Sequence, residues 1–202
     1  MKWSEVLDLL FPAQCVGCNG FGSGLCAACE PARASRVTVA LDGVEVTAFG
    51  WYEGVLRAAI LAVKDGRRDV AHALGERIAP SIATGATLVP IPTTRARRRV
   101  RGFDGVCCIA RAAAQIAGAR VVEALAQPRG HAQRGRSRDE RLTARNRFTC
   151  ATSLRGVGVI LIDDVCTTGA TLADCSRAVR QAGGRVEGAV VVAATKADRR
   201  GS

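Results

Sequence analysis

Long apolar runs, a secretory leader and aromatic side chains are all missing or scarce in this 202-residue sequence. No stretch of 18 or more apolar residues occurs, so the sequence predicts no membrane span. The first twelve residues contain Glu5 and Asp8 and no small-residue cleavage site, which is unlike a secretory signal, so we expect a cytoplasmic protein. Aromatic residues make up 4 %, which leaves few stacking platforms for nucleic-acid bases.

Cysteine, by contrast, is abundant, with nine residues. Four of them form two Cys-x-x-Cys pairs, Cys15 with Cys18 and Cys26 with Cys29, separated by seven residues. Two such pairs can present four thiolates to one tetrahedral Zn²⁺ ion. Because the protein would fill all four positions, we predict a structural zinc ribbon. Four unrelated thiols, or two disulfides, are the alternative.

The net charge of +11 is unevenly distributed. Arginines gather at residues 95–101 and again at 129–147. Such a charge attracts polyanions, whether pyrophosphate, nucleotides or nucleic acid. A solvated basic surface is the alternative interpretation.

Apolar runs alternate between strand-like and helix-like patterns along most of the chain. This alternation, with continuous Val and Ile runs, predicts an α/β fold with a mostly parallel sheet covered on both faces by helices. We expect residues 1–35 to hold a short helix at 3–11 and the zinc ribbon, and residues 36–202 to form the α/β domain. Strands are expected at 37–41, 44–49, 87–91, 120–123, 159–162 and 186–194, and helices at 55–63, 69–83, 105–117, 137–147 and 171–182.

The most informative segment joins an apolar strand, 159–162, to a hydroxyl-rich turn and a helix start. The carboxylates Asp163 and Asp164 follow the strand and suit ribose hydroxyls or a hydrated Mg²⁺ ion. Successive backbone N–H groups beside a helix N-terminus form an anion site. Alternatively, the two aspartates merely cap the helix. The predicted phosphate-binding residues are Val165, Cys166, Thr167, Thr168, Gly169, Ala170 and Thr171.

A second anion-binding segment is predicted where the Val-Pro-Ile-Pro run at 89–92 leads into five arginines. Arginine binds phosphate through two parallel hydrogen bonds and keeps its charge, so Arg97, Arg98 and Arg101 are candidates for binding pyrophosphate. A nucleic-acid patch is the alternative. In a parallel sheet both segments should emerge at the carboxyl ends of the strands.

The segment 159–171 closely resembles the phosphoribosyl pyrophosphate (PRPP) signature of type I phosphoribosyltransferases. Together with further motifs, it makes residues 1–196 similar to the ComF family, phosphoribosyltransferase-like proteins associated with competence and DNA uptake. The chain departs from that family at Asp65, where an aromatic is usual, and at Asp104-Gly105, where Asn-Gln is expected. The matching motifs are the zinc ribbon, Trp51-Tyr52-x-Gly54, Lys64-x-Gly66-Arg67, Val89-Pro90-x-Pro92, Arg98-x-x-Arg101-Gly102-Phe103, Gln133, Arg141, Asn146 with Phe148, and 159–171.

This resemblance implies a type I phosphoribosyltransferase-like fold that binds Mg²⁺–PRPP and acts in DNA uptake or nucleotide metabolism. It implies that Asp163 and Asp164 are the catalytic residues. It also implies a reaction that releases pyrophosphate from PRPP. The implied partners are PRPP, single-stranded DNA and competence-machinery proteins. A non-catalytic, PRPP-responsive protein that binds single-stranded DNA or serves as a scaffold is the alternative. Candidate acceptor or loop contacts, by resemblance, are Tyr52, Lys64, Arg141 and Asn146.

Overall fold

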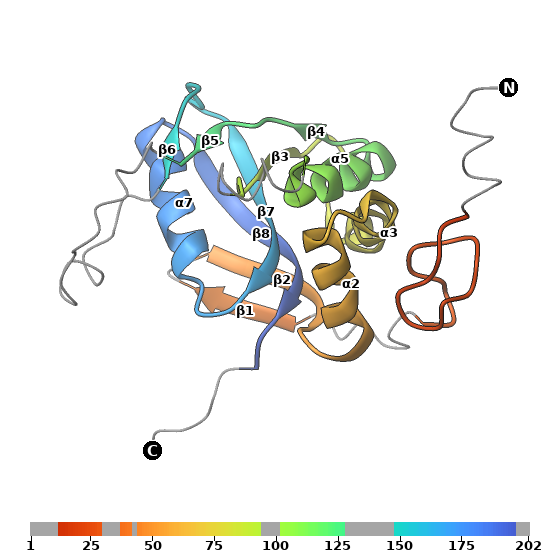
Figure 1. The fold of residues 1–202 in the computed structure, drawn as a ribbon. Helices are drawn as coiled ribbons and strands as arrows, with labels where there is room; N and C mark the ends of the chain where they lie inside the picture. The colour runs from red at the N-terminus through yellow and green to blue at the C-terminus, as the bar shows by residue number, and fades with distance from the viewer. Residues whose placement is uncertain (1–11, 30–36, 42–43, 94–101, 128–147, 197–202) are drawn as a thin grey trace, which may run out of the picture.

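A computed structural model describes residues 12–29, 37–41, 44–93, 102–127 and 148–196 and has an α/β fold (Figure 1). Its main sheet has six strands, of which the first along the chain lies at one edge and runs antiparallel to its neighbour. The other five strands are parallel. In sheet order they are β1 (Val37–Leu41), β2 (Val44–Trp51), β8 (Arg185–Ala194), β7 (Gly158–Cys166), β3 (Thr87–Pro90) and β4 (Arg120–Val121).

Helices cover both faces of this sheet (Figure 1). One face carries α2 (Gly54–Lys64), α3 (Arg68–Ile78), the short 3₁₀ turn η1 (Ala79–Ser81) and α5 (Gly105–Ala117). The opposite face carries α7 (Ala170–Gln181) and a small antiparallel pair, β5 (Leu125–Ala126) with β6 (Thr149–Cys150). Within the described residues, no helix combines the length and the apolar character that a membrane crossing requires.

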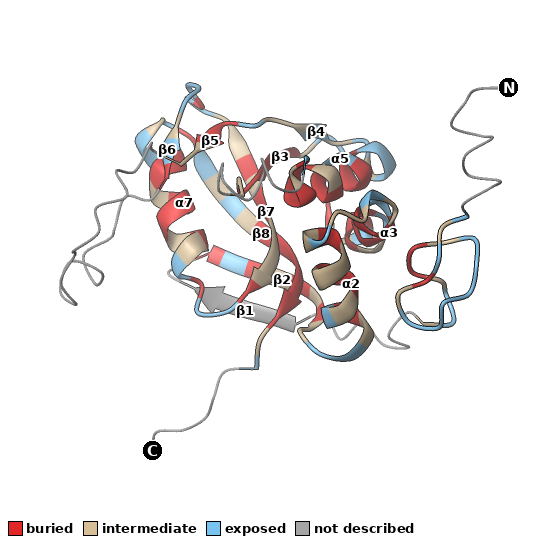
Figure 2. Ribbon diagram, viewed as in Figure 1, coloured by how far each residue is buried: buried red, intermediate tan, exposed pale blue. Residues whose placement is uncertain are grey.

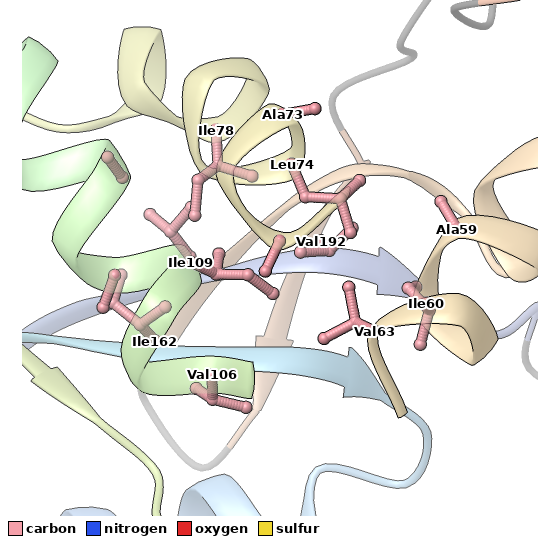
Figure 3. Close-up of a cluster of buried hydrophobic side chains, with 14 of the residues drawn as sticks. Ala59, Ile60, Val63, Ala73, Leu74, Ile78, Val106, Ile109, Ile162 and Val192 are labelled. Atoms are coloured by element: carbon pink, nitrogen blue, oxygen red, sulfur yellow. The ribbon is translucent and has the colours of Figure 1, made fainter. Parts of the chain in front are cut away.

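The larger core lies between the sheet and the three helices α2, α3 and α5, which carry many of the residues coloured as buried in Figure 2. Ile109 of α5 and Leu74 of α3 point into it together with Ile162 of β7 (Figure 3). Small residues allow α3 and α5 to approach closely. A Cβ placed on Gly75 would lie 2.6 Å from the Cβ of Ala112. This packing fixes α5, whose first residues border the second predicted anion segment.

The predicted mostly parallel α/β arrangement is confirmed, with two corrections to its elements. The predicted helix 69–83 is α3 followed by η1, because Pro80 lies in the turn that ends it. The strand predicted at 159–162 extends to Cys166, so Asp163 and Asp164 lie inside β7 rather than after it. The predicted helices at 3–11 and 137–147 lie outside the described residues.

The strand order places a topological switch between β3 and β7. From β3 the chain passes through α5 to β4 on one side, whereas from β7 it passes through α7 to β8 on the other. Because α5 and α7 lie on opposite faces, the segments that follow β3 and β7 diverge. Open α/β sheets bind ligands at this position, beyond the carboxyl ends of the strands.

Candidate functional site

The carboxyl end of β7 extends beyond its neighbour β3. The pairing of β3 with β7 ends at Pro90 opposite Ile162, whereas the pairing with β8 continues to Cys166 opposite Ala194. This longer pairing with β8 explains why the strand includes the polar residues after Ile162. Within the described residues, no strand pairs with the β3 side of residues 163–166. Asp163 and Asp164 therefore lie at the switch point, on a rigid strand.

Asp164 is paired with Lys64, the last residue of α2. The Lys64 ammonium Nζ lies 3.1 Å from Asp164 Oδ2, and the two side chains are 32 % and 23 % exposed. Because both side chains are partly exposed, an anionic ligand can still reach the Lys64 ammonium and a cation can still reach the Asp164 carboxylate. Two residues predicted separately, one from the strand motif and one from the family resemblance, are thus brought together.

Asp163 lies in an unfavourable electrostatic environment. Burial raises the pKa of its carboxyl well above the ordinary value, and the negative charge of Asp164 raises it further. The backbone N–H of Asp164, which donates to Asp163 Oδ1 at 2.8 Å, and the charge of Lys64 act in the opposite direction. Two adjacent carboxylates with one ammonium nearby form a site that a divalent cation would stabilise.

The turn after β7 is short and open. It consists of Thr167, Thr168 and Gly169, because α7 begins at Ala170. Gly169 is the N-cap residue, with φ of 76°, and the Thr168 hydroxyl accepts the N–H of Ala170, the first residue of the helix, at 3.5 Å. Among the described residues, none accepts a hydrogen bond from the backbone N–H of Thr167, Thr168 or Thr171.

This geometry corrects two sequence-based interpretations. Val165 and Cys166 belong to the strand, and Cys166 is buried, so the turn itself starts at Thr167. Asp163 and Asp164 do not cap α7, so helix capping does not explain the carboxylate pair. The open N–H groups and exposed threonine hydroxyls can hydrogen-bond to a phosphate group beside the two carboxylates.

The second predicted anion segment is held at both ends. The Asp104 carboxylate caps α5 by accepting the Cys107 N–H at 3.2 Å, and it also accepts the Thr93 N–H at 3.1 Å. On the other side, the guanidinium of Arg68 lies 5.2 Å from the centre of the Phe103 ring. Residues 94–101, and with them Arg97, Arg98 and Arg101, lie outside the described residues.

Asp104 is one of the positions at which the sequence departs from the family pattern, and the structure gives it a role. We expect Asp104→Ala to lower the free energy of unfolding by about 1–2 kcal/mol, because both the helix cap and the tie to Thr93 are lost. Asp104→Asn should lose only about half as much, because the amide oxygen keeps the cap on Cys107 whereas the amide NH₂ cannot accept the Thr93 N–H. Urea denaturation of the three proteins measures this. Equal destabilisation by both substitutions would contradict the capping role.

The four cysteines predicted to bind zinc do converge. The sulfur atoms of Cys15, Cys18, Cys26 and Cys29 all lie within 4.8 Å of one another, and those of Cys18 and Cys26 are 3.7 Å apart. Sulfur ligands of a tetrahedral Zn²⁺ ion, at about 2.3 Å from the metal, would be about 3.8 Å apart. The four residues are therefore close enough to bind a metal ion.

Backbone N–H groups support the metal-binding form of these thiols. The N–H of Gly17 and that of Cys26 each donate to the Cys15 sulfur at 3.4 Å. The Cys26 N–H is the main cause that lowers the pKa of the Cys15 thiol to about 6. Hydrogen bonding with the Cys18 sulfur raises the pKa of Cys29 to about 12, so the four thiols ionise together only when a cation compensates their charge.

Of the remaining candidates, Tyr52 follows β2 at the same edge of the sheet, and its N–H donates to the Ala194 carbonyl at 2.8 Å. Its side chain packs on the α2, α3 and α5 core. Arg141 and Asn146 lie outside the described residues. The sequence alone assigned no role to Arg68 or Thr93. The capping role of Asp104 was also missed, but it could have been found, because an aspartate directly before an apolar helix is a helix-start signal.

The carboxylate pair, Lys64 and an open turn thus form one candidate site at the switch point, and the cysteine cluster is a separate candidate metal site. Lys64 and Asp164 come from segments far apart in the sequence, so the first of these sites forms only in the folded chain. Neither the family models nor the curated proteins compared with this chain give a match.

Proposed function

We propose that this chain is a PRPP-binding, phosphoribosyltransferase-like protein of the ComF type. The observation that carries the proposal is the carboxylate pair Asp163–Asp164 directly before an open, hydroxyl-bearing turn at the topological switch of the sheet. A phosphorylated sugar needs both parts, one for its hydroxyl groups and one for its phosphate. The short strand-to-helix turn places the two parts side by side.

In this proposal each part of the site binds a different group of PRPP. The N–H groups and hydroxyls of Thr167, Thr168 and Thr171 hold the 5-phosphate, at the N-terminus of α7. Asp163 and Asp164 hold the ribose hydroxyls and a Mg²⁺ ion, for which carboxylate oxygens are suitable ligands. When bound, the ion would neutralise charge on the pyrophosphate.

The arginines of residues 95–101 complete the proposed site as the pyrophosphate-binding segment. The tie between Thr93 and Asp104 brings the start of that segment close to its end, at the carboxyl end of β3. If the chain is a transferase, these arginines stabilise the leaving pyrophosphate, while the nearby carboxylates favour the cationic sugar carbon. The link to DNA uptake or nucleotide metabolism, and single-stranded DNA and competence proteins as partners, belong to the same proposal.

Calorimetric titration of the zinc-loaded protein with PRPP in the presence of Mg²⁺ tests this function. We expect saturable binding that depends on Mg²⁺. The Asp163→Asn/Asp164→Asn double substitution should weaken it by about 100-fold, because the loss of two charge-assisted contacts costs about 3 kcal/mol.

Glu45→Gln is the matched control, because Glu45 is an exposed carboxylate on β2 and its loss should leave binding unchanged. Phosphate, ribose 5-phosphate and ATP serve as competitors that separate PRPP recognition from general anion binding. A folded wild-type protein that shows no Mg²⁺-dependent binding of PRPP would overturn the proposal. Where binding is found, release of pyrophosphate with added acceptor bases distinguishes a transferase from a PRPP-responsive binding protein.

A further inference from the structure

A corner of the chain between α2 and α3, residues 64–69, contacts all three functional parts of the molecule. We call it the 64–69 corner. Lys64 pairs with Asp164 of the carboxylate site. Arg67 donates to the backbone next to the cysteine cluster, and Arg68 contacts Phe103 at the end of the basic segment. One short corner therefore connects the metal site to both predicted anion-binding segments.

On the metal side the contact is close. Arg67 Nη2 donates to the Gln14 carbonyl at 2.6 Å, and Gln14 directly precedes the ligand Cys15. The same guanidinium is held by Asp69, with Nε 2.8 Å from Oδ1. A Cβ placed on Gly24 would lie 2.8 Å from the backbone nitrogen of Val70, so the metal-binding loop lies directly against the start of α3.

On the ligand side the corner has little freedom to adjust. The Arg67 N–H bonds back to the Ala62 carbonyl at 3.0 Å, and the Asp65 N–H bonds to the Leu61 carbonyl at 2.9 Å. These bonds fix the end of α2, from which Lys64 reaches Asp164. Arg68 follows Arg67 directly, and its guanidinium also approaches the Gly102 carbonyl at 3.5 Å. A shift of Arg67 therefore moves Lys64 and Arg68 as well.

We propose that Arg67 is a positioning residue through which metal bound by the four cysteines orders the PRPP site. This inference rests on the proposed function. A small cysteine loop loses its structure without metal, and the Gln14 carbonyl and the Gly24 contact are then lost to the corner. Because such coupling is reciprocal, metal raises the affinity for Mg²⁺–PRPP and Mg²⁺–PRPP raises the affinity for metal by the same factor.

Binding of Mg²⁺–PRPP to zinc-loaded and chelator-treated protein tests the coupling, with calorimetry as the readout. We expect removal of zinc to weaken PRPP binding about tenfold, within the range of about 5- to 150-fold that is typical of coupled sites. Arg67→Ala should weaken binding similarly with zinc still bound, and should then make binding insensitive to zinc. In the reverse direction, saturating Mg²⁺–PRPP should slow transfer of zinc to a chelator in the wild type but not in Arg67→Ala.

Two further variants keep the test independent of folding without metal. Gly24→Ala, whose new Cβ would collide with the Val70 backbone, should lower PRPP affinity while all four zinc ligands remain. Arg57→Ala is the matched control, because Arg57 is an exposed arginine on α2. Amide hydrogen exchange over residues 64–69 should rise in Arg67→Ala and Gly24→Ala and stay unchanged in Arg57→Ala.

The outcomes separate this inference from the function on which it rests. A zinc-loaded wild-type protein that does not bind Mg²⁺–PRPP overturns the proposed function, and the coupling with it. Clear PRPP binding that is the same in zinc-loaded Arg67→Ala and Gly24→Ala as in the wild type overturns the coupling alone. This second result is decisive even if the chelator-treated protein unfolds, because both variants retain zinc.

Discussion

Removal of the metal from the Cys15, Cys18, Cys26 and Cys29 cluster is expected to lower the melting temperature by about 4–20 °C. The reason is that the loop also supplies Leu25, which is fully buried in the same core as α2, α3 and α5. Loss of a buried leucine costs about 2–5 kcal/mol. Each kcal/mol lowers the melting temperature of a protein of this size by about 2–4 °C.

Thermal unfolding followed by circular dichroism, with and without a chelator, measures this effect, and colorimetric titration of released metal should give one zinc ion per chain. Cys26→Ser should reproduce the loss in the absence of chelator. Cys150→Ser, at a half-buried cysteine outside the cluster, should leave both zinc content and melting temperature nearly unchanged. A chelator-treated protein that melts with the wild type would refute a structural role for the metal.

Replacement of Asp163 by asparagine is expected to stabilise the fold while it removes the proposed ligand site. In the absence of ligand, burial and the charge of Asp164 both disfavour the ionised Asp163 carboxylate. An amide of the same shape removes that unfavourable charge. At pH 7 we expect Asp163→Asn to be more stable than the wild type by about 1–2 kcal/mol. This gain would raise the melting temperature by several degrees. Mg²⁺–PRPP binding should fall in the same protein.

The gain in stability of Asp163→Asn over the wild type should increase with pH. Because the pKa of Asp163 is higher in the folded than in the unfolded chain, the folded state holds this proton more tightly. The contribution of the Asp163 carboxyl to stability is therefore complete below its unfolded pKa of 3.8. It is lost as the pH rises towards the pKa of the folded state. The difference between Asp163→Asn and the wild type should accordingly be small near pH 3.8 and grow as the pH rises.

Asp69 has the opposite behaviour and can be distinguished from Asp163. Its hydrogen bonds from Arg67 lower its pKa, so its contribution is present above 3.8 and is lost only in more acidic solution. Melting curves collected from pH 4 to pH 8 therefore report on Asp163, with Glu45→Gln as an exposed carboxylate control. A melting temperature of Asp163→Asn below that of the wild type across this range would show that the carboxylate is not destabilising.

The sequence predicted well those features that depend on local patterns. The helix predicted at 105–117 is observed as α5, because an apolar stripe is bounded by a capping aspartate and by Gly118 in the left-handed conformation. The convergence of the four cysteines followed from their spacing. The carboxylate pair was recognised because an apolar strand precedes it and a hydroxyl-rich turn follows it. Each of these signals is contained in a segment of about fifteen residues, so no tertiary information was needed to recognise it.

Features that depend on partners distant in sequence were not predictable in the same way. The length of β7 is determined by its pairing with β8, so polar residues that are typical of a turn became part of the strand. The pair of Lys64 with Asp164 joins residues a hundred positions apart, and nothing local to either residue indicates the other. The short strands β5 and β6 were not predicted because two residues give no periodicity.

The order of strands in the sheet also has a consequence for how the chain folds during synthesis. β8, the last strand among the described residues, lies in the interior of the sheet between β2 and β7. Until it leaves the ribosome, the antiparallel pair β1–β2 has no strand to connect it with β3, β4 and β7. Such long-range pairing is slow, and unpaired strand edges favour aggregation in the meantime. A chain interrupted before residue 185 would contain every proposed ligand contact and still lack the strand that joins the two halves of the sheet.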